Sequence, residues 1–311
     1  MKFYERLLMK MKLQGVYTPI ITIMKEDGSI DMANMEKHIN HLCEAGIHGI
    51  LFFGSLGEFY ACSMEEKKAV IDMAVRVINH RAVMIVGVGG TALKDVLELA
   101  QYAQKAGADA INVVSPFYFG PTEEGAIAYF GKIAEAVSLP IQLYNFPARV
   151  GADLTPNVIA ELAKKYPNIV GVKDTVDNIS HTRKVIAAVK AVRPDFSVLS
   201  GFDEYYLVNR VSGGDGVLCG LTNVIPEVFV AYHKAYATKD FATTEKYAQI
   251  ISKLMSLYEV TDLFITAIKA AVKAQGLDIS TYTREPGTPI TDAEYQQVQQ
   301  ILHMVKETYK I

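Results

Sequence analysis

Several features are scarce in this sequence, and each scarcity excludes a class of protein. The 311 residues contain only three cysteines, Cys43, Cys62 and Cys219, with no CxxC pair and no metal-ligand spacing. A disulfide framework is therefore not expected, and the cysteine usage favours a reducing, cytoplasmic compartment. No uncharged run approaches the ~18 residues of a membrane-spanning helix. The N-terminal stretch MKFYERLLMKMKLQG lacks the apolar core of a signal peptide, so we expect neither membrane insertion nor secretion.

An excess of charge and the common hydrolase motifs are also missing. The net charge is -3, charged residues make up 21% of the chain and half of the residues are hydrophobic, which argues against disorder and against nucleic acid as a partner. There is no GxSxG elbow and no HExxH pair. GVGGTA, at 87–92, lacks the ending of a phosphate-binding P-loop and is interpreted as a strand-to-helix turn. His38 and His41 lack carboxylate or cysteine support, so a solvated helix face is favoured over a metal site.

The first 220 residues repeat one pattern. Short, nearly continuous apolar runs are each followed by a segment with helical periodicity, which is typical of βα units with parallel strands buried on both faces. Gly46 and Gly107 stand where left-handed residues end two of these helices. The eight runs lie near Val16, Leu51, Ile85, Val113, Leu143, Val172, Val198 and Leu218.

Eight such units close most economically as a (β/α)₈ TIM barrel, so we predict an α/β protein with a catalytic barrel over 1–225. An open doubly wound sheet is the structural alternative, but TIMKEDGS after the first strand has no glycine fingerprint. From 226 to 311 only helical patterns occur, interrupted by TYTREPGTP. They predict a C-terminal helical extension packed on the barrel, with helices at about 226–237, 240–258, 261–275 and 292–309.

The carboxyl ends of the strands are where a barrel of this class carries its active site. Lys173 ends the apolar strand IVGVK, where burial disfavours the ammonium and favours a neutral, nucleophilic amine that can form an imine with a ketone. The alternative is a lysine that reaches the rim or pairs with Asp174. Tyr144 ends the preceding strand and is either a proton carrier or a core tyrosine. Tyr118 has the same two readings.

The GSLGE turn is a weaker signal. Its backbone N–H groups and the Ser55 hydroxyl could hold a carboxylate, because glycine lets the chain approach an anion closely. The same turn could equally be a structural one. The candidate residues at the ends of the later strands are Thr175, Gly201, Asp203 and Glu204.

Five strings at strand ends, in this order, carry a family resemblance: GSLGE, SPFYFGP, YNFPARVG, GVKDT and GFDE. Together they resemble the pyruvate-dependent class I aldolases that include dihydrodipicolinate synthase, N-acetylneuraminate lyase and 2-keto-3-deoxygluconate aldolase. The resemblance covers nearly the whole chain. It implies a Schiff-base mechanism without metal or other cofactor.

The resemblance also implies roles for single residues. Lys173 matches the imine-forming lysine and Tyr144 the tyrosine that shuttles protons. Ser55 matches a hydroxyl between substrate carboxylate and tyrosine, and the backbone N–H groups of Ser55 and Leu56 would bind that carboxylate. Tyr118 matches a tyrosine that reaches into an adjacent subunit, which implies a homo-oligomer, commonly a tetramer built as a dimer of dimers.

The residues expected to determine which aldehyde is formed give conflicting indications of the substrate. Arg149 resembles the arginine with which the synthases hold aspartate semialdehyde, whereas Leu56 replaces the usual threonine of the synthase turn. Asp203 and Glu204 match a pair that binds sugar hydroxyls. YNFP, KDTVDN and GGDG most resemble the bacterial branch that acts on 2-keto-3-deoxy sugar acids. We therefore favour cleavage of such an acid to pyruvate and an aldehyde.

Several alternatives remain open at this point. Within the family they are 4-hydroxy-tetrahydrodipicolinate synthase, N-acetylneuraminate lyase and a dehydratase. Arg149 has a purely structural alternative, as a rim arginine paired with Glu58 or Asp153. Beyond the family, the alternatives are a metal- or phosphate-dependent barrel enzyme and a catalytically idle scaffold.

Overall fold

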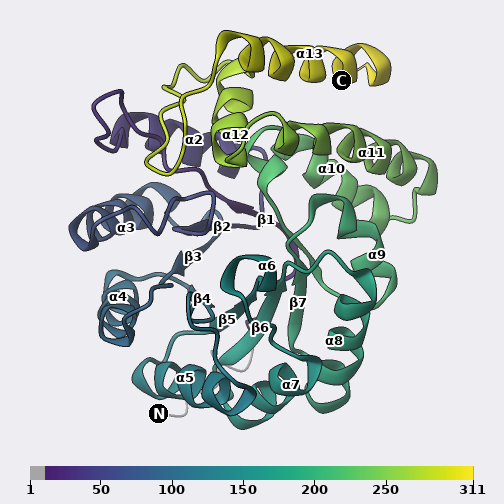
Figure 1. The fold of residues 1–311 in the computed structure, drawn as a ribbon. Coiled ribbons are helices and arrows are strands. Elements are labelled where there is room, and N and C mark those ends of the chain that lie inside the picture. Colours follow the sequence, from purple (N-terminus) through teal and green to yellow (C-terminus); the bar gives the residue numbers. More distant parts are fainter. Residues whose placement is uncertain (1–10, 311) are drawn as a thin grey trace. The chain divides into compact units, whose positions relative to one another are not determined.

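The computed structural model describes residues 11–310 of the chain (Figure 1). Eight parallel strands form a closed barrel and follow one another around it in sequence order. All of them are almost completely buried, as the continuous apolar runs predict. The predicted (β/α)₈ barrel is confirmed. The strands are β1 (Gly15–Pro19), β2 (Gly49–Phe52), β3 (Val83–Gly87), β4 (Ala110–Val114), β5 (Ile141–Asn145), β6 (Ile169–Asp174), β7 (Ser197–Ser200) and β8 (Gly216–Leu218).

Helices follow the strands, and their ends have clear chemical causes. Ser63 caps α3 in a capping box with Glu66, which satisfies N–H groups that the first turn leaves unpaired. Gly46 (φ 85°) and Gly107 (φ 100°) adopt the predicted left-handed conformation after their helices. The helices of the βα units are α2 (Met32–Glu44), α3 (Met64–Ile78), α4 (Leu93–Ala106), α5 (Glu123–Ala136), α7 (Pro156–Lys165), α8 (Ile179–Val192) and α9 (Tyr206–Val211).

The chain forms two compact units. The first unit consists of Val83–Leu218 with the chain up to Gly15, and contains β3 to β8 and α4 to α9. The second unit consists of Val16–Ala82 and Cys219–Ile311. The division into a barrel at 1–225 and an extension at 226–311 stays a prediction of the sequence.

The second unit contains all of the C-terminal helices. The predicted helices at 226–237 and 292–309 are present as α10 (Pro226–Ala237) and α13 (Asp292–Tyr309), and α13 packs on α11 and α12 (Figure 1). The other two are shorter than predicted. α11 (Phe241–Leu254) passes into a 3₁₀ helix at Met255–Glu259, and α12 (Phe264–Ala274) begins only after Leu263. Such tightening of a last turn is common at helix ends.

One expectation for α2 is wrong. His38 does not face solvent: it is 1% exposed, and its Nε2 lies 3.1 Å from the Asn223 side-chain oxygen. Burial lowers its pKa to about 4, so it is a neutral core histidine. His41 does lie on the exposed face, 3.6 Å from a Glu227 carboxylate oxygen. The two side chains differ because the inward stripe of the helix, with Met35, Ile39 and Leu42, includes His38.

Candidate active site

The ends of β5 and β6 bring two of the predicted catalytic residues together. Tyr144 and Lys173 are register partners on these paired strands, so their side chains leave the sheet on the same face. They are 3% and 5% exposed. The Lys173 Nζ atom lies 4.3 Å from the centre of the Tyr144 ring. A buried amine and a phenol therefore lie within reach of one substrate atom.

The alternative that Lys173 pairs with Asp174 does not fit the structure. Neighbouring residues on a strand point to opposite faces, and the Asp174 carboxylate is bound by the side chains of Asn145, His181 and Thr182. Within residues 11–310, no carboxylate lies within ion-pair distance of Lys173. Lys173 thus combines burial with the absence of a carboxylate partner among these residues.

A polar network lies behind the Tyr144–Lys173 pair. Asn145 follows Tyr144 and is 0% exposed; its amide donates to Asp153 at 2.9 Å and to Asp174 at 3.0 Å. Its side-chain oxygen accepts from the Leu154 backbone N–H at 3.0 Å. The Asp174 carboxylate also accepts a 2.6 Å hydrogen bond from the hydroxyl of Thr182 on α8. These contacts join the ends of two strands, the loop at 151–155 and the start of α8.

His181 completes this network. Its Nδ1 lies 3.1 Å from Asp174 Oδ2 and its Nε2 lies 3.2 Å from Asp153 Oδ2. Burial alone would lower the pKa of His181, but hydrogen bonds and charge from Asp153 and Asp174 outweigh it and raise that pKa to about 10. Only the imidazolium can donate from both nitrogens at once. The cluster therefore holds one positive charge between two carboxylates.

Arg149 lies on a single helical turn, α6 (Pro147–Val150), directly after β5. Proline occupies the first position of the turn, and Gly151 ends it at φ 75°. Arg149 is exposed, and its guanidinium carbon lies 5.9 Å from the centre of the Phe146 ring. Asp153, one carboxylate considered as its structural partner, is bound instead by Asn145 and His181.

Thr175 and Gly201 pack closely at the ends of β6 and β7. The Gly201 N–H donates to the Asp174 carbonyl at 2.8 Å. A Cβ atom at Gly201 would lie 1.9 Å from Thr175 Oγ1, so only glycine fits beside this threonine. Thr175 Oγ1 is buried and has no hydrogen-bond partner among the described residues. A buried hydroxyl without a partner is costly unless a ligand or water satisfies it.

Three acidic residues lie after β6 and β7. Asp203 is 2% exposed and Glu204 is exposed; both lie on the 3₁₀ turn Asp203–Tyr205. Partial burial, together with the carboxylates of Asp203 and Asp177, raises the pKa of Glu204. The Tyr205 hydroxyl donates to Asp177 at 2.7 Å. Asp177 was not predicted as a site residue, although it belongs to the KDTVDN segment that carries part of the family resemblance.

Ser55 and Leu56 belong to the second unit, in the turn after β2. A Cβ at Gly57 would lie 2.8 Å from the Phe53 backbone nitrogen, so the turn requires glycine. The Gly57 carbonyl accepts from the Thr22 hydroxyl at 2.7 Å. Leu56 is 4% exposed. Its buried side chain leaves the turn's backbone as the part that can bind a ligand.

An ion pair anchors the far end of this turn. Glu58 has φ 52°, and its carboxylate pairs with the amine of Lys269 on α12; both side chains are 0% exposed. The same carboxylate accepts from the Arg284 backbone N–H at 2.9 Å, and Lys269 donates to the Tyr282 carbonyl at 2.6 Å. Burial lowers the pKa of Lys269, whereas Glu58 acts in the opposite direction. Both carboxylate oxygens of Glu58 thus bind groups of the second unit.

Tyr118 lies apart from the buried residues of the first unit. It is 89% exposed, stands at φ 77°, and stacks edge-on against Phe119, which is 82% exposed. A left-handed conformation is strained for a non-glycine residue. Two large aromatic side chains exposed together are unusual on a free surface and typical of interfaces.

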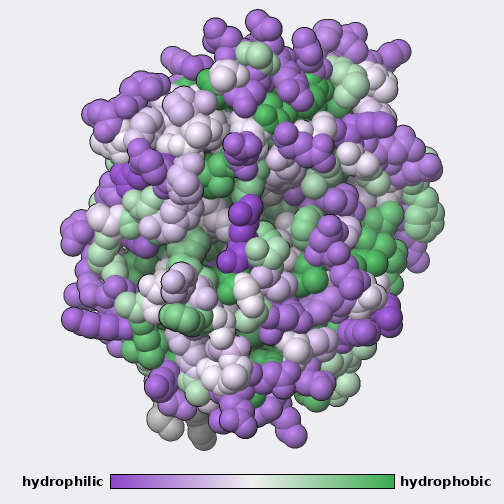
Figure 2. Space-filling view, in the orientation of Figure 1, coloured by the Kyte–Doolittle hydropathy of each residue, from purple (hydrophilic) through white to green (hydrophobic). Residues whose placement is uncertain are grey.

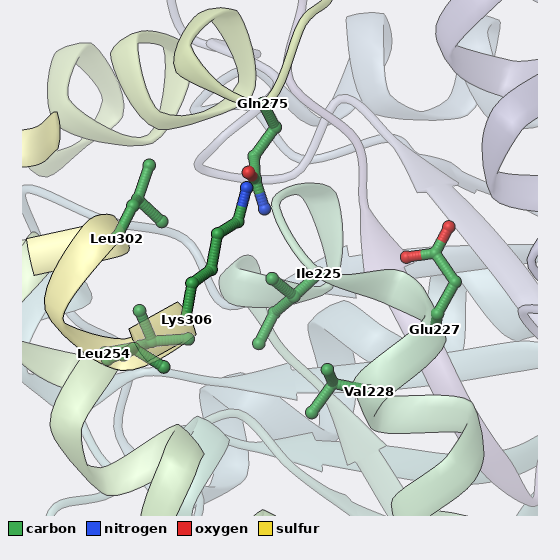
Figure 3. Close-up of a pocket in the computed structure, with 8 residues that line it drawn as sticks. Ile225, Glu227, Val228, Leu254, Gln275, Leu302 and Lys306 are labelled. Atoms are coloured by element: carbon green, nitrogen blue, oxygen red, sulfur yellow. The ribbon is translucent and has the colours of Figure 1, made fainter. Parts of the chain in front are cut away.

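One pocket lies among the C-terminal helices (Figure 3). Its wall is mostly aliphatic, and the amine of Lys306 points toward the side chain of Gln275. None of the predicted site residues takes part in it. The lining residues are Ile225, Glu227, Val228, Leu254, Gln275, Leu302, Val305 and Lys306.

Within residues 11–310, no group of three or more His, Cys, Asp or Glu side chains is arranged to hold a metal ion. None of the described helices combines the length and apolar character required to cross a bilayer. The face in Figure 2 is largely polar, with smaller apolar areas between the polar groups.

Comparison with known proteins decides the family. The model of the dihydrodipicolinate synthetase family matches residues 12–305. The chain belongs to this family. The family resemblance predicted from GSLGE, YNFPARVG and GVKDT is thereby confirmed.

Individual members refine this result. YagE of Escherichia coli K12, named as a 2-dehydro-3-deoxy-D-gluconate aldolase, is 37% identical over 292 residues, covering 94% of this chain and 97% of YagE. YjhH of the same strain, named as a 2-dehydro-3-deoxy-D-pentonate aldolase, is 34% identical, covering 88% and 91%.

Solved structures agree with these relatives. The crystal structure of YagE in complex with pyruvate has a TM-score of 0.93 at 36% identity, covering 94% of this chain and 99% of that one. A monomeric dihydrodipicolinate synthase variant has a TM-score of 0.89 at 27% identity, covering 94% and 96%. Family members with both kinds of name thus share this fold.

The predicted residues and the unpredicted ones differ in the elements that carry them. Within the first unit, Tyr144 and Lys173 lie at the ends of neighbouring strands and contact each other, and Thr175 and Gly201 follow strand ends and pack together. His181 and Lys269 were not predicted as site residues. They lie within α8 and α12, where helical spacing does not distinguish them from other polar residues, and the Glu58 partner of Lys269 is 211 residues away.

Proposed function

We propose that this protein is a class I aldolase that cleaves a 2-keto-3-deoxy sugar acid, such as 2-keto-3-deoxygluconate, to pyruvate and an aldehyde. The observation that carries the proposal is the buried Lys173 amine, which lies 4.3 Å from the Tyr144 ring centre and without a carboxylate partner among residues 11–310. An uncharged amine in this position is a nucleophile for the substrate ketone.

The proposed chemistry uses the iminium as an electron sink. The Lys173 amine attacks the C2 carbonyl, Tyr144 donates its phenolic proton to the departing hydroxyl, and water leaves, which gives a protonated imine and a Tyr144 phenolate. The C4 hydroxyl loses its proton to this phenolate, the C3–C4 bond breaks, and its electron pair moves to the iminium nitrogen to form an enamine. The aldehyde departs and Tyr144 returns the proton to C3 of the enamine. Water then hydrolyses the iminium, its released proton goes back to the Tyr144 phenolate, and pyruvate and the free amine are released.

The other site residues take supporting roles in this proposal. The backbone N–H groups of Ser55 and Leu56 bind the substrate carboxylate, and the Ser55 hydroxyl lies in the proton path to Tyr144. The family motif and the glycine-dependent turn support this assignment. Thr175 and Gly201 line the pyruvate site, where the unpartnered Thr175 hydroxyl can bind substrate.

The aldehyde half of the substrate is assigned to the more variable residues. Asp203 and Glu204 bind sugar hydroxyls, which accept and donate hydrogen bonds with carboxylates. Arg149 contacts the distal part of the substrate. The names of YagE and YjhH support a sugar acid as substrate.

A synthase that joins pyruvate to aspartate semialdehyde is the second candidate. The exposed guanidinium of Arg149 favours it, because a guanidinium can bind a second carboxylate through two hydrogen bonds. Leu56, in the position where the synthase turn normally has threonine, and the acidic pair Asp203 and Glu204 favour the sugar acid instead.

We further propose a cytoplasmic homotetramer, a dimer of dimers in which Tyr118 reaches the site of an adjacent subunit. Its exposure beside Phe119 supports a buried position in an assembly. The three free cysteines support a reducing compartment. Light scattering on the native protein and on Tyr118→Ala tests the assembly; a monomeric wild type contradicts it.

Trapping with borohydride tests the central claim. Incubation with pyruvate and borohydride should add one reduced pyruvate to the peptide that contains Lys173, as read by mass spectrometry. No adduct, or an adduct elsewhere, contradicts the mechanism. The substrate is tested on the same preparation with 2-keto-3-deoxygluconate, its pentonate analogue, N-acetylneuraminate, and pyruvate plus aspartate semialdehyde. Turnover of only the last pair, lost in Arg149→Ala, would establish the synthase instead.

A further inference from the structure

The segment after β5 has one helical turn of its own, in which the N–H groups of Arg149, Val150 and Gly151 donate to the Phe146 and Pro147 carbonyls. It comprises the single turn α6 (Pro147–Val150), which carries Arg149, and the loop at 151–155 that leads into α7. One helical turn is too short to be stable by itself. The orientation of Arg149 must therefore be fixed by contacts that the segment makes with the rest of the first unit.

Most of the polar contacts of this segment lead to one cluster. Both carboxylate oxygens of Asp153 are occupied, Oδ1 by the Asn145 amide at 2.9 Å and Oδ2 by His181 Nε2 at 3.2 Å. The Leu154 N–H binds the Asn145 side-chain oxygen at 3.0 Å. Asn145 is buried and part of β5, so these contacts connect the segment to the barrel strand.

His181 is the only positive group in this cluster among the described contacts. It comes from the first turn of α8 and is 12% exposed, while the side chain of Asp174 is fully buried and that of Asp153 is 37% exposed. Without the imidazolium, two carboxylates that share the Asn145 amide would repel each other. Asp174 belongs to β6, which is paired with β5 and β7, whereas Asp153 lies in a loop. The strain would therefore displace Asp153 and the segment attached to it.

We propose that His181 is a positioning residue for substrate specificity: by bridging Asp174 and Asp153, it holds the α6 segment so that Arg149 faces the distal end of the substrate. This inference rests on the proposed function, because it assigns Arg149 to the substrate. His181 does not touch the reacting atoms. Its loss should affect recognition of the aldehyde half and leave formation of the Schiff base at Lys173 intact.

Kinetics of His181→Gln test the specificity part. We expect KM for 2-keto-3-deoxygluconate to rise about tenfold, the equivalent of one charge-assisted hydrogen bond. The rate of borohydride trapping of pyruvate should stay within about twofold of wild type on the same scale. The matched control is His41→Gln, which removes a histidine from an exposed contact with Glu227 and should change neither value.

A fall in trapping that parallels the fall in cleavage, with KM unchanged, would overturn the proposal, because it would show a general loss of active structure. Unchanged kinetics in every assay would overturn it as well. Asp153→Asn keeps the acceptor for Asn145 but removes the charge that faces His181. It should raise KM in the same direction as His181→Gln.

Hydrogen–deuterium exchange separates this inference from the proposed function. In His181→Gln the amides of 147–155 should exchange at least several-fold faster than in the native protein, while those of β5 and β6 stay protected. This readout needs no substrate. If native protein fails to trap pyruvate, the proposed function fails, and exchange still decides whether His181 holds the segment. Unchanged exchange over 147–155 would refute the positioning role.

Discussion

Two lysines are buried in the described part of the chain, one in each unit, and their surroundings are opposite. Lys269 is 0% exposed and lies between the Glu58 carboxylate and the Tyr282 carbonyl. Lys173 is 5% exposed and lies against the Tyr144 ring, with no carboxylate in ion-pair distance among residues 11–310. The Lys269 amine is thus paired with a carboxylate, whereas the Lys173 amine faces an aromatic ring.

Comparison of Lys173 with Lys269 shows that burial alone does not identify a reactive lysine. A buried ammonium is tolerated where a carboxylate and further hydrogen bonds satisfy it, as at Lys269. A buried lysine amine that no carboxylate engages, as at Lys173, is instead available to a substrate carbonyl. Counter-ion, rather than depth, therefore separates a structural lysine from a candidate catalytic one.

The largest expected contrast comes from the two lysine-to-methionine variants. Lys173→Met should abolish the pyruvate adduct and cleavage while folding normally, because methionine removes an amine without leaving a charge unpaired. Lys269→Met should lower the free energy of unfolding by about 3–5 kcal/mol, since Glu58 stays buried without its partner. Borohydride trapping and urea denaturation of both variants measure the contrast. The expected contrast is contradicted if Lys173→Met unfolds or if Lys269→Met denatures like wild type.

A double variant tests whether Glu58 and Lys269 stabilise the protein as a pair. Glu58→Gln combined with Lys269→Met removes both charges, so the protein should be more stable than Lys269→Met alone by roughly 2 kcal/mol. Urea denaturation of wild type, both single variants and the double variant gives the coupling energy. Strictly additive losses would mean that the two side chains do not act as a pair.

The ion pairs of His181 with Asp153 and Asp174, in contrast to the Lys269–Glu58 pair, are expected to depend on pH in an accessible range. The pKa of His181 is raised from 6.5 to about 10, so its stabilisation is complete below about pH 6.5 and is lost as the pH rises toward 10. Asp153, whose pKa is lowered from 3.8, contributes at higher pH and loses its contribution on acidification. Between pH 6.5 and 10, wild type should lose roughly 1.5–3 kcal/mol more than His181→Gln. Parallel denaturation curves of the two proteins over this range would contradict the assignment.

The smallest expected effect concerns Arg149. Because it is exposed and its ring contact with Phe146 is loose, at 5.9 Å, Arg149→Ala should leave stability nearly unchanged. KM for 2-keto-3-deoxygluconate should rise about tenfold, whereas trapping of pyruvate should be unaffected. Lys184→Ala, on α8, serves as a control for a removed surface charge. Equal KM values for Arg149→Ala and wild type would show that Arg149 does not contact the substrate.

The fold and the lysine–tyrosine pair could be predicted because their signals are local. Each strand is a run of apolar residues, and Lys173 and Tyr144 occupy equivalent positions near the ends of neighbouring runs. Eight such runs that alternate with helices are enough to predict a closed barrel. The helix at 240–258 was predicted too long, since periodicity does not distinguish α11 from the 3₁₀ turn that follows Leu254.

The long-range polar contacts could not be predicted in this way. His38 lies on the inward stripe of α2, but its hydrogen-bond partner Asn223, which makes burial of an imidazole possible, is 185 residues later. Glu58 and Lys269 are separated further still. In each case the partner is chosen by tertiary packing, which no window of sequence contains.

The short turn α6 has a consequence for how enzymes of this architecture change substrate. Pro147 starts the turn and Gly151 ends it, and Ala148 and Arg149 between them are exposed. Both side chains can be exchanged without a change in the buried strands. If Arg149 contacts the substrate as proposed, a library limited to positions 148 and 149 alters the preference for the aldehyde and leaves the barrel intact.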